Sequence, residues 1–140
     1  MVFEPNVLKV MQEDAQQRFP LECVGFLFGS QKTGETVVVK AQPTSNVHPD
    51  DQRRRFAIDP LAYMRAEKQA LKEDLVLVGI YHSHPNYVAI PSIHDHEQAL
   101  PGWSYPIVSV HENGVDHIRS WRLNSEDLFQ EETIIERGKK

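Results

Sequence analysis

The chain contains 140 residues, of which 40% are hydrophobic and 25% are charged, and its formal net charge is −5. This size and composition predict one globular domain over residues 1–140, since domains commonly contain about 100 to 150 residues. The acidic balance argues against a sequence-independent nucleic-acid-binding protein, because such proteins neutralise phosphates with clustered basic side chains. No apolar run approaches the roughly 20 residues that cross a membrane, so no membrane association is expected.

The start of the chain and its cysteine usage predict a cytoplasmic protein. Residues 1–19 lack the charged segment followed by a long apolar segment that secretory signals have. Cys23 is the single cysteine, so no disulfide framework is indicated. Because Cys23 lies in an apolar run without a basic neighbour, we expect a small buried hydrophobic side chain rather than a nucleophile.

One helix and two strands are predicted before residue 43. Apolar residues at helical spacing indicate an amphipathic helix that ends near residue 18. The short apolar run 23–29 and the β-branched run 36–39 predict two antiparallel strands. The Thr33-Gly34 pair between them predicts a turn.

The next segment predicts a loop, a short strand and a second helix. Residues 43–52 carry Pro, Asn and Asp without periodicity, which is typical of a loop, and residues 54–58 have the composition of a short strand. Asp59 suits the position that caps a helix, and Pro60 suits the first helical position. We expect this helix to continue to about residue 73.

The last third alternates strands with a helix. The apolar run 75–81 predicts a strand that is covered on both faces, and residues 82–91, rich in His, Pro and Asn, predict a loop. Residues 92–100 have the length of a short helix. Two further strands are expected at 105–111 and 117–123.

The hairpin turn and the end of the chain complete this prediction. Asn113-Gly114 is a typical hairpin turn between the last two strands. The charged stretch from residue 124 predicts a weakly amphipathic tail helix. Segregated strands and helices together predict an α+β fold with helices packed on a sheet.

Four of the seven histidines fall within residues 82–96. His82 and His84 lie two apart at the end of a predicted strand, where alternate side chains point to the same face, so both imidazoles converge on one ion. Asp95 follows eleven residues after His84, in the first turn of the predicted helix. Two histidines and one carboxylate leave the fourth position of a tetrahedral zinc open, as catalytic zinc sites do.

Simpler interpretations of these residues stay open on spacing alone. Two histidines at a strand end are commonly exposed polar residues, and Glu22 is equally consistent with a charged residue at a strand edge. Ser92 and Asp95 have the spacing of a capping box, in which the serine begins a helix and an acidic residue follows three positions later.

The joint pattern resembles the JAMM (JAB1/MPN/Mov34 metalloenzyme) family. That family has an upstream glutamate, then His-x-His, seven residues, serine, two residues and aspartate, and this chain fills the pattern with Glu22, His82, His84, Ser92 and Asp95. The resemblance implies the MPN/JAB fold, which is cytidine-deaminase-like: a mixed, mostly antiparallel sheet flanked by helices in α/β/α layers. It also implies one Zn²⁺ per chain, bound by His82, His84 and Asp95.

The same resemblance implies a zinc metalloprotease that hydrolyses a peptide or isopeptide bond after the C-terminal Gly-Gly of a ubiquitin-like protein. Glu22 is then the general acid and base that activates a zinc-bound water. The Ser92 hydroxyl donates to the oxyanion. Because the chain shows no long insertion, it is similar to the short prokaryotic members. These members process small sulfur-carrier proteins, and the C-terminal tail of such a carrier is the expected partner.

Several alternatives accompany this hypothesis. A non-catalytic scaffold of the same fold is one, although such members typically lack the metal ligands. Fe(II) also uses two histidines and a carboxylate, and here the resemblance favours zinc. A zinc deaminase needs a Pro-Cys-x-x-Cys segment that one cysteine cannot supply. A DNA-associated relative is disfavoured by the acidic charge.

The remaining histidines and one basic run have no assigned chemistry. His94 and His96 flank Asp95 on a helix and point about 100 degrees away from it, so they are not expected to bind the same ion. His48, His111 and His117 are treated as surface residues. The run Arg53-Arg54-Arg55 is either a solvated face or a contact for an acidic partner or a terminal carboxylate.

Overall fold

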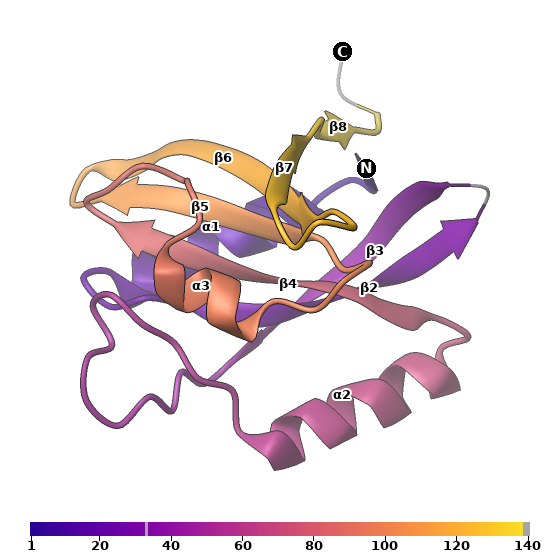
Figure 1. Ribbon diagram of the computed structural model, residues 1–140, viewed down its shortest axis with the longest axis horizontal. Coiled ribbons are helices and arrows are strands. Elements are labelled where there is room, and N and C mark those ends of the chain that lie inside the picture. Colours follow the sequence, from indigo (N-terminus) through magenta and orange to yellow (C-terminus); the bar gives the residue numbers. More distant parts are fainter. Residues whose placement is uncertain (33, 139–140) are drawn as a thin grey trace.

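The computed structural model describes residues 1–32 and 34–138, and within these ranges eight strands form one mixed sheet (Figure 1). Their order across the sheet is β7-β6-β5-β4-β2-β3-β1-β8. The longer strands pair antiparallel except for β4 and β5, which are parallel. The strands are β1 (Val2–Phe3), β2 (Val24–Lys32), β3 (Glu35–Thr44), β4 (Val76–Pro85), β5 (Tyr105–His111), β6 (Gly114–Leu123), β7 (Phe129–Glu132) and β8 (Ile135–Glu136).

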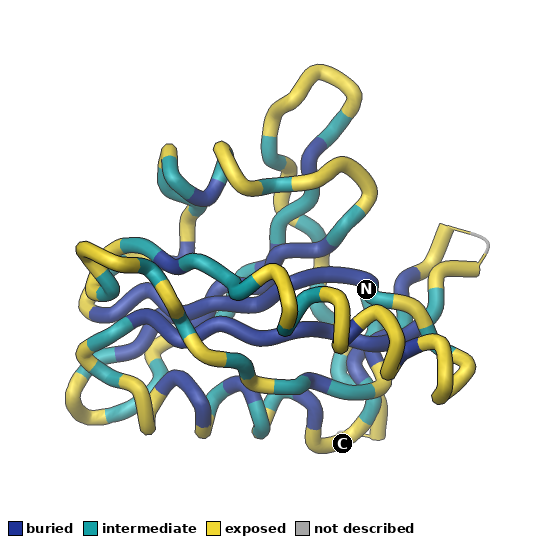
Figure 2. The backbone as a smooth tube through the Cα atoms, turned by 90° about the horizontal axis from the view of Figure 1, so that it is seen from below, coloured by how far each residue is buried: buried dark blue, intermediate teal, exposed yellow. Residues whose placement is uncertain are grey.

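Helices cover both faces of this sheet. The helix α1 (Val7–Arg18) packs on one face, whereas α2 (Pro60–Lys72) and α3 (Ile93–Gln98) lie on the other (Figure 1). Figure 2 shows the central strands as buried segments and the projecting turns as largely exposed. This arrangement confirms the predicted α+β fold with α/β/α layers.

A separate apolar core lies on each face of the sheet. Between the sheet and α1, the core contains Phe3, Met11, Leu27, Tyr81 and Val108, among others. On the opposite face, α2 packs its alanines against a cluster of aromatic and aliphatic side chains, which includes Phe26, Phe28, Phe56, Ile80 and Tyr105. Because strands alternate their side chains, β2 and β4 contribute to both cores and are fixed from both sides.

Both long helices have the ends that the sequence predicts. The first ends at Arg18. The second begins at Pro60, and the Asp59 side chain accepts a hydrogen bond of 3.1 Å from the Leu61 N–H. An extended Asp59 with a side-chain acceptor satisfies an amide that has no partner within the helix, so the helix starts there.

The strand β4 is longer than predicted. The sequence indicates a strand up to residue 81 and a loop over residues 82–91, but β4 continues to Pro85. Pairing with β5 extends the strand, since His82 to Pro85 lie beside residues 107–110. The two histidines therefore belong to the middle of the sheet rather than to a flexible loop.

The prediction of a short strand at residues 54–58 is wrong. This segment is irregular because the N–H groups of Arg54 and Arg55 both donate to the carbonyl of Asp51, which makes a turn. Asn46 then holds the segment from the side: its Nδ2 donates to the Arg55 carbonyl, and its Oδ1 accepts from the Ala57 N–H, each at 3.1 Å. These side-chain bonds take the place of a strand partner.

The predicted tail helix from residue 124 is also wrong. The Asn124 side-chain oxygen accepts hydrogen bonds from the N–H groups of Glu126 and Leu128, at 2.8 and 3.1 Å. Such bonds compete with helix formation and favour a turn. The chain instead reverses and adds β7 along β6, and β8 then pairs with β1.

The predictions for the two turns between neighbouring strands are confirmed in part. The turn near Asn113 is confirmed, and β6 starts at Gly114 rather than at residue 117. In the predicted turn between β2 and β3, Thr33 lies outside the described residues, while Gly34 has a left-handed φ of 79°.

No helix in residues 1–32 and 34–138 is long and apolar enough to span a bilayer.

Candidate active site

Two buried histidines project from the central strand β4. His82 is 1% exposed and His84 is 0% exposed. Hydrogen bonds hold this strand on both edges, with His82 opposite Val24 of β2 and opposite Ile107 of β5. Their two-residue spacing directs both imidazoles to the face that carries α3, as the sequence predicts.

A capping box at the start of α3 directs Asp95 to the same point. The Ser92 Oγ accepts from the Asp95 N–H at 3.1 Å, and Asp95 Oδ2 accepts from the Ser92 N–H at 2.8 Å. The Asp95 side chain is only 6% exposed. The cap therefore fixes the carboxylate, and the structural role of this motif is compatible with metal binding.

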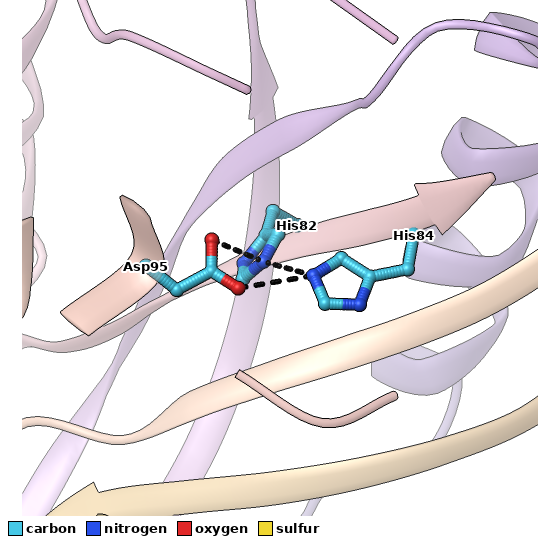
Figure 3. Close-up of side chains that lie close together, drawn as sticks. All are labelled: His82, His84 and Asp95. Atoms are coloured by element: carbon cyan, nitrogen blue, oxygen red, sulfur yellow. Dashed lines mark hydrogen bonds and ion pairs between the residues drawn. The ribbon is translucent and has the colours of Figure 1, made fainter. Parts of the chain in front are cut away.

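Figure 3 shows that the three side chains converge on one another. The Nε2 atoms of His82 and His84 are 3.1 Å apart. Asp95 Oδ1 lies 3.2 Å from His82 Nε2, and Asp95 Oδ2 lies 3.0 Å from His84 Nε2. Zinc bonds of about 2.0 to 2.1 Å place tetrahedral ligand atoms about 3.3 Å apart, so the group fits Zn²⁺ with little adjustment. Among the described residues, His82, His84 and Asp95 form the group of His, Cys, Asp or Glu side chains whose ligand atoms lie close enough together to hold one metal ion.

Neighbouring groups hold the two imidazoles in place. His84 Nδ1 donates to the Val88 carbonyl at 2.8 Å, which leaves Nε2 as the ligand nitrogen. The Tyr87 ring stacks on His84 with 4.0 Å between centroids, and the Phe56 ring lies 4.7 Å from His82. The histidines are thus packed as well as hydrogen-bonded, as a preformed metal site requires.

The charges of His82, His84 and Asp95 favour a cation bound among them. Burial lowers the pKa of His82, but the negative charges of Asp95 and Glu22 outweigh burial and raise it above its ordinary value. Burial and the charge of His82 lower the pKa of His84. Burial opposes ionisation of Asp95, yet the two histidines hold the pKa of its carboxyl well below the usual range. The raised pKa of His82 favours a proton on its imidazole in the metal-free protein, and a metal ion bound there would have to displace that proton.

Glu22 is a buried carboxylate beside this group. Its side chain is 1% exposed, and its Oε2 accepts a hydrogen bond of 2.7 Å from the Tyr87 hydroxyl. In the described structure Oε1 has no hydrogen-bond partner. Burial raises the pKa of Glu22 to about 7, although the charge of His82 and the bond from Tyr87 act in the other direction. A carboxyl that titrates near neutral pH suits both uptake and release of a proton.

The comparison with protein families identifies the domain. The model of the prokaryotic homologs of the JAB domain matches residues 4–124. The chain belongs to this family. The matched residues include all five members of the pattern of glutamate, histidines, serine and aspartate. The family resemblance seen in the sequence is confirmed.

Named relatives of this JAB-domain protein include proteases. A probable TtuB-protein conjugate cleaving protease from Thermus thermophilus is 40% identical over 104 residues, which are 74% of this chain and 63% of the relative. A desampylase from Pyrococcus furiosus is 30% identical over 129 residues, which are 92% of this chain and 82% of the relative. The chain thus spans less than two thirds of the Thermus relative and most of the Pyrococcus one.

Solved structures agree with the JAB fold. The solution structure of a Desulfitobacterium hafniense protein superposes with a TM-score of 0.86 at 28% identity, covering 99% of this chain and 94% of the other. A JAB1/MPN domain protein from Archaeoglobus fulgidus superposes with a TM-score of 0.61 at 19% identity, covering 97% of this chain and 96% of the other. The predicted JAB1/MPN fold is confirmed.

The other histidines of the JAB domain lie in separate environments. His96 Nε2 donates to the Asp127 carbonyl at 2.7 Å and links α3 to the tail, away from the metal-binding group. His117 Nε2 accepts from the Ala89 N–H and supports the loop after β4. The Nδ1 atoms of His48 and His111 accept hydrogen bonds from nearby backbone N–H groups in turns. Cys23 is buried, and burial raises the pKa of its thiol.

Two residues that position Glu22 were not identified from the sequence. Tyr87 lies in the loop after β4, and Asn46 lies 24 residues after Glu22. Asn46 Nδ2 donates to the Glu22 carbonyl at 3.1 Å, and the Glu22 N–H donates to the Gln52 carbonyl at 2.7 Å. A polar residue in a loop gives no signal of such distant contacts, so only the fold reveals them.

Cavities border the metal-binding group. An apolar pocket of about 200 Å³ is lined by His82 and Asp95 together with aromatic and aliphatic side chains, including Phe56, Tyr63 and Tyr105. A wider cavity of about 730 Å³ is lined by Pro20, Asp51, Arg53, Arg54, Pro85, Asn86, Tyr87, Ser92 and His94, and is called the arginine cleft below. The site is therefore accessible to a substrate.

Proposed function

We propose that this JAB-domain protein is a zinc-dependent peptidase that hydrolyses the bond after the C-terminal Gly-Gly of a ubiquitin-like protein. One observation carries the proposal: a buried carboxylate, Glu22, lies beside a group of three side chains with the spacing of zinc ligands. The relatives named as a TtuB-protein conjugate cleaving protease and as a desampylase support a ubiquitin-like conjugate as the substrate. A small sulfur-carrier protein is the substrate that we favour.

His82, His84 and Asp95 would hold the Zn²⁺. When bound, the metal would polarise the scissile carbonyl and make a water molecule acidic enough to attack at neutral pH. The metal would take the place of the proton that the raised pKa of His82 favours in the metal-free protein. The Tyr87 ring, stacked on His84, and the Phe56 ring, packed at a tilt against His82, keep the imidazoles from turning away.

Glu22 moves the proton. With a pKa raised to about 7, its carboxylate accepts a proton from the attacking water and returns that proton to the departing amine. The Tyr87 hydroxyl occupies Oε2, so Oε1 is the atom free for this transfer. A general acid and base of this kind contributes roughly a hundredfold to ten-thousandfold to the rate.

Ser92 stabilises the developing negative charge. Its Oγ accepts a hydrogen bond from the Asp95 N–H, which leaves the hydroxyl proton free to donate. Donation to the oxyanion of the tetrahedral intermediate is typically worth about a hundredfold in rate. The capping bond and the donation use different parts of the same hydroxyl group, so Ser92 serves both roles.

A non-catalytic scaffold of the same fold is the alternative. Such a protein has no need for a carboxylate held in the interior, where burial disfavours its charge. The retention of Glu22 together with the complete ligand group favours the enzyme.

Incubation with an extended carrier tests the proposed activity. A ubiquitin-like sulfur carrier with a two-residue extension after its Gly-Gly end is mixed with the zinc-loaded protein, and its intact mass is followed with time. We expect cleavage after the second glycine, and loss of cleavage when a chelator removes the metal. Full zinc loading without cleavage of the extended carrier, or of the same carrier linked to a lysine, would favour the scaffold.

Replacing Tyr87 by Phe tests whether the hydrogen bond from the Tyr87 hydroxyl positions the Glu22 carboxylate. The phenylalanine ring keeps the stacking on His84 but cannot donate to Glu22, so we expect kcat to fall about tenfold while KM changes less than about threefold. Zinc content, measured by atomic emission, should equal that of the wild type. An unchanged kcat would show that Glu22 is held well enough by packing alone.

A further inference from the structure

The arginine cleft has a local charge opposite to that of the whole protein. The chain carries a net charge of −5, but the cleft is lined by Arg53 and Arg54 against a single carboxylate, that of Asp51. Both arginine residues are exposed. Among the described residues, neither guanidinium forms an ion pair or a side-chain hydrogen bond, so both are free to bind a ligand.

The backbone presents these two arginines on an ordered turn. The Arg54 N–H donates to the Asp51 carbonyl, and the Gln52 carbonyl accepts from the Glu22 N–H at 2.7 Å. The Gln52 side chain also donates to the carbonyls of Asn46 and His48. The turn that bears the arginines is therefore attached directly to the backbone of the proposed general base.

The arginine cleft reaches residues that contact the proposed catalytic groups. Tyr87 and Ser92 line it, and Tyr87 holds the Glu22 carboxylate that returns the proton to the amine. Arg54 and Tyr87 line the same cleft. The apolar pocket instead contacts His82 and Asp95 and contains no arginine. Because Glu22 would return its proton to the departing amine, a leaving group beside Tyr87 would lie at the cleft that carries the arginines.

We propose that Arg53 and Arg54 bind a carboxylate on the leaving-group side of the scissile bond. The proposal rests on the proposed function and names a feature of its substrate. Guanidinium groups form paired, charge-assisted hydrogen bonds with carboxylates, which a neutral amide cannot reproduce. That carboxylate is either the free C-terminus of a short tail or an Asp or Glu side chain within two residues of the bond.

Three matched substrates separate these sources. The carrier with a two-residue Ala-Ala extension is prepared with a free terminal carboxylate, as the terminal amide, and as the amide of an Ala-Glu extension. We expect the wild type to cleave at least one of the acidic substrates about tenfold faster than the neutral amide, measured as kcat/KM. The acidic substrate that is favoured identifies the source of the carboxylate.

Variants of the arginines test the assignment. In the double variant Arg53→Gln/Arg54→Gln, the preference for the acidic substrate should fall from about tenfold to less than twofold. The matched control is Arg65→Gln, which removes one exposed positive charge from α2, outside the cleft, and should keep the preference. Equal rates for all three substrates in the wild type, or a preference that survives in the double variant, would overturn the proposal.

A binding measurement keeps this result separate from the failure of the proposed function. If none of the substrates is cleaved, the activity is refuted, and the carboxylate is then tested with peptides ending in Gly-Gly-Ala-Ala. We expect the acid form, but not the amide, to shift the NMR signals of the Arg53 and Arg54 Nε–H groups, assigned with single variants. No shift with either peptide overturns the proposal.

Discussion

Replacing Glu22 by Gln is expected to lower kcat roughly a hundredfold to ten-thousandfold, the contribution of a positioned general acid and base. The amide has nearly the same shape and still accepts a hydrogen bond from Tyr87, but it cannot take a proton from water. The variant should bind zinc with the wild-type stoichiometry, since Glu22 is not part of the ligand group. Activity is measured on the extended carrier, and a loss of less than about tenfold would place the general base elsewhere.

The same variant should be more stable than the wild type at high pH in the metal-free state. Folding raises the pKa of Glu22 from 4.5 to about 7, so the folded protein binds this proton more tightly than the unfolded chain does. Stability from this group is therefore greatest below about pH 4.5 and declines as the pH rises toward 7. Glu22→Gln removes that decline, and its free energy of unfolding should exceed that of the wild type by roughly 1 to 3 kcal/mol above pH 7.

Denaturant unfolding of both proteins at pH 5 and pH 8 measures this difference. A gain that is much larger at pH 8 than at pH 5 accompanies a correctly buried carboxylate and shows that the loss of activity is not a loss of fold. An equal difference at the two pH values would mean that Glu22 titrates as it does in the unfolded chain. The proposed general base thus opposes folding, as residues kept for chemistry commonly do.

The sequence predicted the convergence of His82, His84 and Asp95 better than the surroundings of this group. His82, His84 and Asp95 were found because their spacing obeys local rules, namely alternation along a strand and the first turn of a helix. Ser92 and Asp95 obey a further local rule, the capping box, which the structure shows to hold the proposed ligand in place.

Most of the misses depend on distant partners, and one also depends on local side-chain bonds. Nothing near Tyr87 in the chain shows that it reaches Glu22, 65 residues away. The segment 54–58 has the composition of a strand, but Asn46 satisfies its backbone from the side. The tail after residue 124 has no helix because Asn124 bonds to the following amides and β6 offers a free edge. Tertiary contacts outweighed weak local preferences at Tyr87 and in residues 54–58, whereas after residue 124 local side-chain bonds acted together with strand pairing.

Metal binding should stabilise the folded protein strongly. A ligand at a hundred to a thousand times its Kd adds about 2.7 to 4.1 kcal/mol to the free energy of unfolding. For a domain of this size we expect zinc to raise the Tm of the metal-free wild type by about 10 °C. The rise should be larger at pH 8 than at pH 6, because zinc must displace the proton that the raised pKa of His82 retains.

Asp95→Asn is the variant that tests this site most sharply. The asparagine oxygen can still accept from the Ser92 N–H and keep the helix cap, but the negative charge between the two histidines is gone. We expect the zinc-induced rise in Tm to fall below about 2 °C. His96→Ala is the matched control on the same helix, since that imidazole faces Asp127, and it should keep the full rise. An undiminished rise in Asp95→Asn would place the stabilising zinc at another site and remove the metal from beside Glu22.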